Sequence, residues 1–172
     1  SAAGTACSLP ENVTVCTVVR AVNSHGLASN RQRSNGVRIC RADGLVAGTV
    51  QERAFAGPST LVLADGDVDF TSSRRLPISW HSFSSSCAPI DFYEVRLQKY
   101  DAVLGQWADE GGAVQVGGAH SATSAHVSVF TLDPTPSSGS TAPTQFRALV
   151  CASDLIGSRV CAASNGVTLD ET

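Results

Sequence analysis

Six cysteines are the residues of this 172-residue chain whose chemistry is easiest to interpret. None lies in the Cys-x-x-Cys spacing of a zinc site or a thioredoxin-like motif. An even number without metal spacing indicates disulfides, which form in an oxidising compartment. The sequon Asn12-Val13-Thr14 points to the same compartment, and whether Asn12 is glycosylated stays open. The six candidate disulfide residues are Cys7, Cys16, Cys40, Cys87, Cys151 and Cys161.

Three aspartates at alternate positions, Asp65, Asp67 and Asp69, are the candidate ligands for a hard cation such as calcium. Their spacing lacks the rest of an EF-hand loop, since no glutamate follows at its final position. The alternative is a solvated turn that leads into the next strand. The sequence therefore predicts no metal site other than this weak calcium candidate.

The four histidines do not form a catalytic pattern. No His-Glu-x-x-His spacing occurs among His25, His81, His120 and His126. The chain also contains no Gly-x-Ser-x-Gly elbow and no glycine-rich phosphate loop. We therefore expect a protein that is not an enzyme and that has no cofactor.

Composition excludes several further classes. Hydrophobic residues make up 42% and charged residues 16% of the chain, unlike a disordered protein. The net charge of -3 and the scattered arginines give no reason to expect nucleic acid as a partner. The longest apolar segment, residues 13–22, includes Arg20 and is too short for direct membrane insertion. Because Met is absent, we expect a processed chain or a piece of a longer one.

Apolar residues alternate with polar ones in several short runs, which is the pattern of half-buried β-strands. Clusters of Gly, Pro, Ser and Asn separate the runs, and no window shows a helical stripe. These features predict an all-β, antiparallel sandwich. The residues expected to face its core are Leu76, Ile78, Trp80, Tyr93, Val95, Leu97, Val127, Val129, Phe146, Ala148, Val150, Ala152, Val167 and Leu169.

The chain also repeats itself. Residues 18–40 parallel residues 149–170, and the tripeptide Ser-Asn-Gly occurs at Ser34 and again at Ser164, 130 positions later. A unit that recurs at about the size of one domain predicts tandem modules.

Residues 45–172 resemble a fibronectin type III domain. Leu76-x-Ile78-x-Trp80 is similar to the family's second strand, Ile90-x-x-Tyr93 to its third, and Phe146-x-Ala148 to its sixth. Residues 1–44 resemble the C-terminal hairpin of a preceding repeat. The phrases DGDVDF, LPISWHSF and PIDFYEVRL are similar to repeats in large extracellular proteins of algae and other protists. The resemblance implies an immunoglobulin-like sandwich of fibronectin type III type, stapled by disulfides and arranged in tandem.

The hairpins that this resemblance implies suggest the cysteine pairing. Cys16 and Cys40 flank one hairpin, and Cys151 and Cys161 flank the other, so each set is expected to form a bridge. In a tandem array, Cys7 and Cys87 lie at facing poles of adjacent modules, which suggests an interdomain disulfide. The alternative, that Cys7 or Cys87 pairs outside this chain, stays open.

The expected function is that of a structural or adhesive repeat of a large extracellular or cell-surface protein. Its partners would be other repeats of the same polypeptide and neighbouring chains, with glycans as a further class. The alternative is a ligand-binding ectodomain module of a cell-surface receptor, with Trp107 and Arg74 as candidate contacts. A tryptophan packed on one sheet is the competing interpretation of Trp107.

Overall fold

The computed structural model describes residues 13–39, 44–56, 64–117, 126–135 and 143–170. The chain divides into two compact units, Ser1–Gly44 and Leu45–Thr172, called unit 1 and unit 2 below. All regular secondary structure among the described residues is β-strand. This part of the chain has no helix long and apolar enough to cross a membrane.

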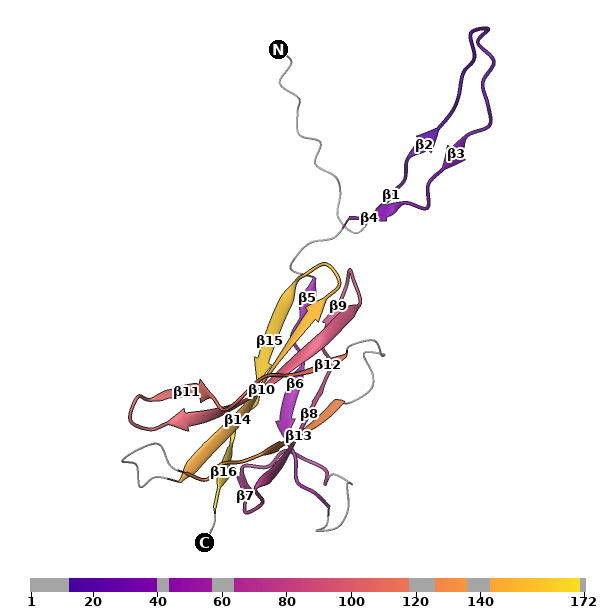
Figure 1. The fold of residues 1–172 in the computed structure, drawn as a ribbon. Coiled ribbons are helices and arrows are strands. Elements are labelled where there is room, and N and C mark those ends of the chain that lie inside the picture. Colours follow the sequence, from indigo (N-terminus) through magenta and orange to yellow (C-terminus); the bar gives the residue numbers. More distant parts are fainter. Residues whose placement is uncertain (1–12, 40–43, 57–63, 118–125, 136–142, 171–172) are drawn as a thin grey trace. The chain divides into compact units, whose positions relative to one another are not determined.

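The described part of unit 1, residues 13–39, is a long hairpin of two chain segments, drawn in indigo and purple in Figure 1. Strands β1 (Thr14–Val15) and β4 (Val37–Arg38) pair at its base, and β2 (Val18–Val19) and β3 (Gln32–Arg33) pair further along. Polar turn residues between Val22 and Ala28 reverse the chain. A hairpin of two strands is marginal by itself in water, because nothing covers its faces.

Unit 2 contains a seven-stranded sheet whose main path is β11-β10-β14-β16-β7. Strand β12 pairs with β10, and β15 pairs with β14. Every pair in this sheet is antiparallel except β16 and β7, which are parallel. The bounds are β7 (Phe70–Thr71), β10 (Ile90–Asp101), β11 (Gln106–Asp109), β12 (Val114–Gly117), β14 (Thr144–Asp154), β15 (Arg159–Ala163) and β16 (Val167–Leu169).

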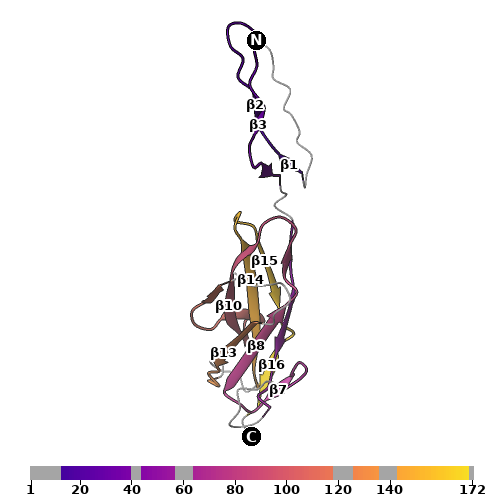
Figure 2. The same cartoon turned by 90° about the vertical axis from the view of Figure 1, so that its right-hand side faces the viewer.

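A three-stranded antiparallel sheet in the order β13-β8-β6 faces the larger sheet. Its strands are β6 (Thr49–Glu52), β8 (Arg75–His81) and β13 (His126–Thr131). A short pair, β5 (Leu45–Val46) with β9 (Ser84–Ser85), lies beside them. Figure 2 shows β8 crossing in front of β14, as in a two-layer sandwich. The expected all-β sandwich is confirmed, with the parallel β7–β16 pair as the exception to antiparallel order.

The core fills the space between the two sheets with alternate residues of the strands. Trp80 of β8 is fully buried, and its ring meets the edge of Tyr93 of β10 at a centroid distance of 5.7 Å. Twelve of the fourteen residues expected to face the core are at most 4% exposed: Leu76, Ile78, Trp80, Tyr93, Val95, Leu97, Phe146, Ala148, Val150, Ala152, Val167 and Leu169.

The prediction is wrong for β13, where Val127 and Val129 are 47% and 43% exposed. The register with β8 pairs Phe130 with Leu76, and directly opposite residues of an antiparallel pair share a face. Phe130 therefore packs against the core, and the two valines face outward. The predicted alternation along β13 is correct, but the inward and outward positions are exchanged, because valines occupy the outward positions.

Candidate functional site

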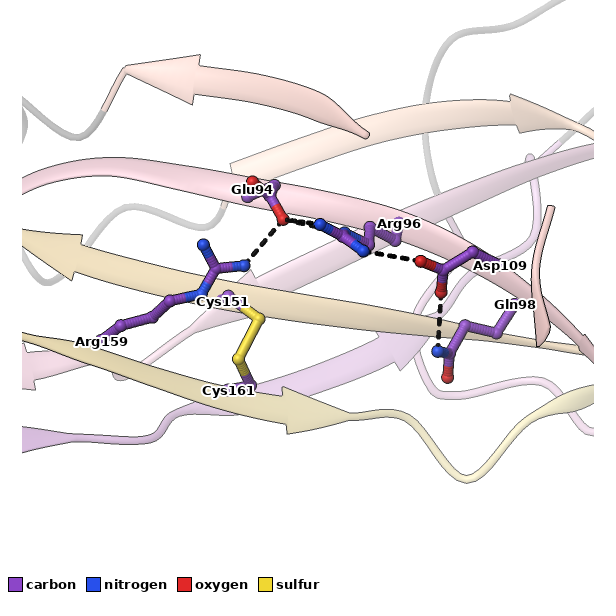
Figure 3. The surroundings of a disulfide bond; sticks show 7 residues. All are labelled: Glu94, Arg96, Gln98, Asp109, Cys151, Arg159 and Cys161. Carbon is purple, nitrogen blue, oxygen red and sulfur yellow. Dashed lines mark hydrogen bonds and ion pairs between the residues drawn. A yellow bond between two sulfur atoms is a disulfide. The ribbon is translucent and has the colours of Figure 1, made fainter. Parts of the chain in front are cut away.

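The outer face of the larger sheet carries the predicted Cys151–Cys161 disulfide. The register of β14 and β15 sets the two residues directly opposite each other. Their sulfur atoms are 2.04 Å apart, so this pairing is confirmed. Figure 3 shows charged side chains gathered alongside the bridge. The disulfide therefore ties β15 to β14 at the margin of a polar surface.

The predicted Cys16–Cys40 bridge is wrong, because Cys16 is a free thiol. The register pairs Val15 with Val37 and so sets Cys16 opposite Gly36. A Cβ atom on Gly36 would lie 2.7 Å from Cys16 Sγ. Cys40 is four positions further along the sequence and lies outside the described residues.

Cys87 follows β9 in unit 2. It is disulfide-bonded, and its backbone N–H donates to Ser85 Oγ at 3.3 Å. Its predicted partner, Cys7, lies outside the described residues, as does the sequon residue Asn12. The Cys7–Cys87 pairing and the glycosylation of Asn12 therefore stay predictions.

Charged side chains form a continuous network beside the disulfide (Figure 3). Glu94 on β10 accepts hydrogen bonds from Arg96 at 2.8 Å and from Arg159 on β15 at 2.7 Å. Arg96 also donates to Asp109 on β11 at 2.6 Å, and Gln98 donates to the other oxygen of Asp109 at 2.9 Å. Three strands that are separate in the sequence are thus joined by one chain of polar contacts, which we call the outer-face network.

The network holds its carboxyl groups in the ionised form. Hydrogen bonds from Arg159 and Arg96 lower the pKa of Glu94. Hydrogen bonds from Gln98 and then Arg96 lower the pKa of Asp109. A lowered pKa in the folded state adds stability that is present at neutral pH and is lost as the pH falls through that pKa. The arrangement therefore acts as a brace across the sheet.

Trp107 on β11 lies at the far end of this face and is half-buried. The Arg147 guanidinium of β14 stacks over its ring at 4.5 Å, and the Tyr100 ring lies 5.2 Å away. Arg147 Nε also donates to Gln98 Oε1 at 2.8 Å, which connects the stack to the outer-face network. Burial lowers the pKa of Arg147. Two of the protein's own side chains thus contact the Trp107 ring, as expected of a tryptophan packed on a sheet.

The three aspartates of the calcium candidate do not converge. Asp65 is fully exposed and lies 3.8 Å from Arg53. Asp69 accepts a hydrogen bond from Asn165 at 3.3 Å. Within the described residues, no three His, Cys, Asp or Glu side chains are grouped so that they could hold a metal ion.

Among the described side chains, the outer-face network does not include His25, His81 or Arg74. His25 is in the turn of unit 1, with Nδ1 3.4 Å from Ser24 Oγ. His81 Nδ1 is 2.8 Å from Ser82 Oγ at the end of β8. His120 lies outside the described residues, and of His126 the structure gives only its backbone position in β13. The Arg74 carbonyl accepts the Leu132 N–H at 2.7 Å, so its backbone links the ends of β8 and β13.

Glu52 is a buried ionisable residue that the sequence analysis missed. It ends β6, is 0% exposed and accepts a hydrogen bond from Ser164 Oγ. Burial raises the pKa of Glu52, and this outweighs the lowering effect of Ser164. Two signals were available: Glu52 follows Val50 at the inward period of two, and Ser164 begins the repeated Ser-Asn-Gly.

The two hairpins of the chain turn in the same way. Asn23 Oδ1 accepts hydrogen bonds from the N–H groups two and four residues further along, at 3.0 and 2.9 Å. Asp154 Oδ1 does the same at 3.1 and 2.8 Å. Gly26 and Gly157 follow with φ angles of 78° and 86°, a region that favours glycine.

The base of each hairpin is also built alike. Ser34 Oγ accepts the Thr17 N–H at 3.0 Å, and the Ser34 N–H donates to the Thr17 carbonyl at 2.9 Å. Ser164 makes the same two bonds with Ala148, at 2.8 and 2.9 Å. The glycine two positions after each serine has a φ of 87° and 100°, respectively. The sequence repeat therefore corresponds to two hairpins with one geometry.

Comparison with known proteins finds no matching protein-family model, no matching curated protein and no matching solved structure.

Proposed function

We propose that this chain is a structural repeat segment of a large extracellular or cell-surface protein, in which sandwich units act as spacers and assembly surfaces. The observation that carries the proposal is the recurrence of one hairpin geometry, in turn and base, about 130 residues apart. Repetition of the same supersecondary structure along a chain is typical of modular arrays.

The strand arrangement supports a sandwich of fibronectin type III type. The strands that resemble the family's second, third and sixth are β8, β10 and β14. Strand β8 lies in the smaller sheet, while β10 and β14 are neighbours in the larger one. Immunoglobulin-like sandwiches divide the corresponding strands between their sheets in the same way.

The disulfide supports an extracellular location. The Cys151–Cys161 bridge joins two neighbouring strands of the larger sheet, with Cys161 exposed and Cys151 buried. Such bridges persist in oxidising compartments and stabilise small secreted domains. A disulfide and a polar network across the sheet would help such a module to resist unfolding and to keep neighbouring modules at a fixed distance.

The alternative, a receptor module with a specific ligand, requires an exposed aromatic or arginine hot spot. Of its two candidate contacts, Trp107 and Arg74, the ring of Trp107 already contacts Arg147 and Tyr100. We therefore retain the structural role as the proposal.

Limited proteolysis of intact cells that make the protein tests it. Cells are treated with a cross-linker and then with a protease that cannot enter them, and the released peptides are sequenced. We expect unit 2 peptides in the released fraction, cross-linked to peptides of the same polypeptide or of neighbouring copies. Release only after lysis would overturn the extracellular location, and cross-links to one soluble ligand would support the receptor alternative.

A further inference from the structure

The inner face of the unit 1 hairpin is open, whereas its counterpart in unit 2 is closed. The shared turn and base align the two hairpins residue by residue. On this alignment the inward apolar residues of unit 1 are Val15, Val19 and Val37, which are 39%, 61% and 69% exposed. Their counterparts in unit 2 are at most 1% exposed: Phe146, Val150 and Val167.

Unit 2 shows which strands close such a face. Strand β14 pairs with β10 along most of its length, from Phe146 opposite Lys99 to Asp154 opposite Ile90. The smaller sheet supplies the buried side chains of β8 and β6 to the same core. Among the described residues, no strand outside the hairpin pairs with either edge of the unit 1 hairpin.

The outer face of the unit 1 hairpin is basic. Residues 13–39 contain no Asp or Glu and four arginines, namely Arg20, Arg31, Arg33 and Arg38. Val18 pairs with Arg33 and Thr14 with Arg38, at positions that alternate with the inward valines. The arginines therefore lie on the face opposite the apolar one.

Arg20 occupies the position that Cys151 has in unit 2. There, Cys151 is directly opposite Glu94 of β10, whose carboxylate binds two arginines. Residues 45–172 carry thirteen acidic against seven basic residues, whereas residues 1–44 carry five basic against two acidic. A β10-like strand beside the unit 1 hairpin would thus bring a carboxylate to Arg20.

We infer that the unit 1 hairpin is a docking surface for the remaining strands of a second sandwich of the unit 2 type. The occupant is a strand set equivalent to β6, β8, β10 and β13. It buries Val15, Val19 and Val37 and sets an acidic residue at the Glu94 position beside Arg20. This inference rests on the proposed repeat organisation and deepens it, because it names the partner of the hairpin and its chemistry.

A tandem fusion tests the inference. Residues 45–131 are placed ahead of Ser1 in the full chain, so that residues 1–12 replace the twelve-residue connection 132–143. We expect the amides of the unit 1 hairpin to exchange hydrogen about 100-fold more slowly than in the unextended chain, because opening would then require the new sandwich to unfold. Unchanged exchange, with unit 2 of the same fusion intact, would overturn the inference.

Neighbouring variants separate docking on the inner face from a general effect. In the fusion, Val19→Asp should abolish the protection, while Val18→Asp on the outer face should leave most of it. Arg20→Glu should weaken the protection, and Glu94→Arg in the added copy should restore it. If Val19→Asp and Val18→Asp reduced the protection equally, the proposed geometry would be wrong. It would also be wrong if Glu94→Arg did not restore the protection lost in Arg20→Glu.

A chimera provides a second measurement that does not depend on the fusion. Residues 13–39 replace residues 144–169 in unit 2 of the full chain, so the unit 1 hairpin must complete the sandwich of unit 2. We expect a cooperative unfolding transition that Val19→Asp, placed in the grafted copy, lowers and Val18→Asp there does not. Loss of the transition in the chimera would contradict the inference.

The oligomeric state of the unextended chain tests whether a second unit 1 hairpin covers the inner face instead. A dimer of residues 1–172 that Val19→Asp dissociates would show that a second hairpin covers this face, and the inference would fail. These experiments measure completion of the hairpin only, whereas the cell-surface proteolysis measures the location and neighbours of the chain. Failure of one is thus distinguishable from failure of the other.

Discussion

Glu52 carries a carboxyl group between the two sheets of unit 2. Its Oε1 accepts a hydrogen bond from Ser164, while Oε2 is buried with no hydrogen-bond partner among the described residues. Desolvation raises the pKa of Glu52 above its ordinary value of 4.5, and the negative charge of Asp67 adds to this effect. The folded state therefore favours the protonated form. The stability that Glu52 contributes is present below its ordinary pKa and is lost as the pH rises through the raised one.

Replacement of Glu52 by glutamine isolates this effect. Glu52→Gln keeps the Oε1 acceptor for Ser164 and has no charge at any pH. We expect the variant to be more stable than the wild type at pH 7 by about 1–3 kcal/mol, because the wild type must bury a carboxylate charge or bind a proton to neutralise it, whereas the glutamine does neither. The difference should vanish near pH 4, as measured by urea denaturation across the pH range. Asp65→Asn, at a fully exposed carboxylate, serves as the control; a Glu52→Gln difference independent of pH would refute the account.

Trp107 offers a second test at the scale of the residue. Trp107→Ala removes the stack with Arg147 and the contact with Tyr100. We expect a loss of about 1–3 kcal/mol in unfolding free energy, because cation–π and aromatic contacts each contribute up to about 1–2 kcal/mol. Trp107→Phe should recover part of it. Unchanged stability of Trp107→Ala would favour a binding role for this side chain instead.

The β14–β15 hairpin depends on its disulfide at the scale of the element. The bridge joins residues ten positions apart in the sequence. Replacing Cys151 and Cys161 by serine together should lower the unfolding free energy of unit 2 by about 2–3 kcal/mol, from the loop-closure entropy of a loop of this length. Chemical denaturation gives the value, and Cys16→Ser, at the free thiol, should leave unit 2 unchanged. A double variant as stable as the wild type would show that the bridge does not constrain the unfolded chain.

The link between β5 and β6 depends on a glycine. A Cβ atom on Gly48 would overlap the His81 carbonyl oxygen and the Phe83 ring and backbone. Gly48→Ala should therefore cost about 1–3 kcal/mol, as overpacking does in a close-packed interior. Gly112→Ala is the matched control, since no atom lies within 4 Å of its added Cβ. Thermal unfolding followed by circular dichroism distinguishes the two, and equal melting temperatures would contradict the close approach.

The strand pattern was predictable from the sequence wherever the inward positions hold the larger apolar residues, as along β8, β10 and β14. It failed at β13, because Val127 and Val129 are exposed. Ser128 and Phe130 face inward there instead. The prediction also failed at Cys16, because Cys16 and Cys40 are not symmetric about the turn of this hairpin, whose register sets Cys16 opposite Gly36. The Cys151–Cys161 pair was predictable, since the two residues lie symmetrically about a tight turn.

At the scale of the whole molecule, the turn and base motifs were visible in the sequence as a repeat, but the outer-face network was not. Glu94, Asp109 and Arg159 come from three strands that only the tertiary fold brings together. The inward position of Glu52 could be predicted from its spacing to Val50, but its contact with Ser164, 112 positions away in the sequence, could not. Local patterns therefore defined the elements, and long-range pairing created the polar contacts between them.

The proposed repeat organisation would place the chain in an extended extracellular array of sandwich units. Electron microscopy of the native assembly, labelled on unpermeabilised cells with an antibody against unit 2, distinguishes such an array from an isolated protein. We expect label along surface structures at a regular spacing, as tandem copies would give. Label that appears only after permeabilisation, or on isolated particles without a repeat, would contradict it.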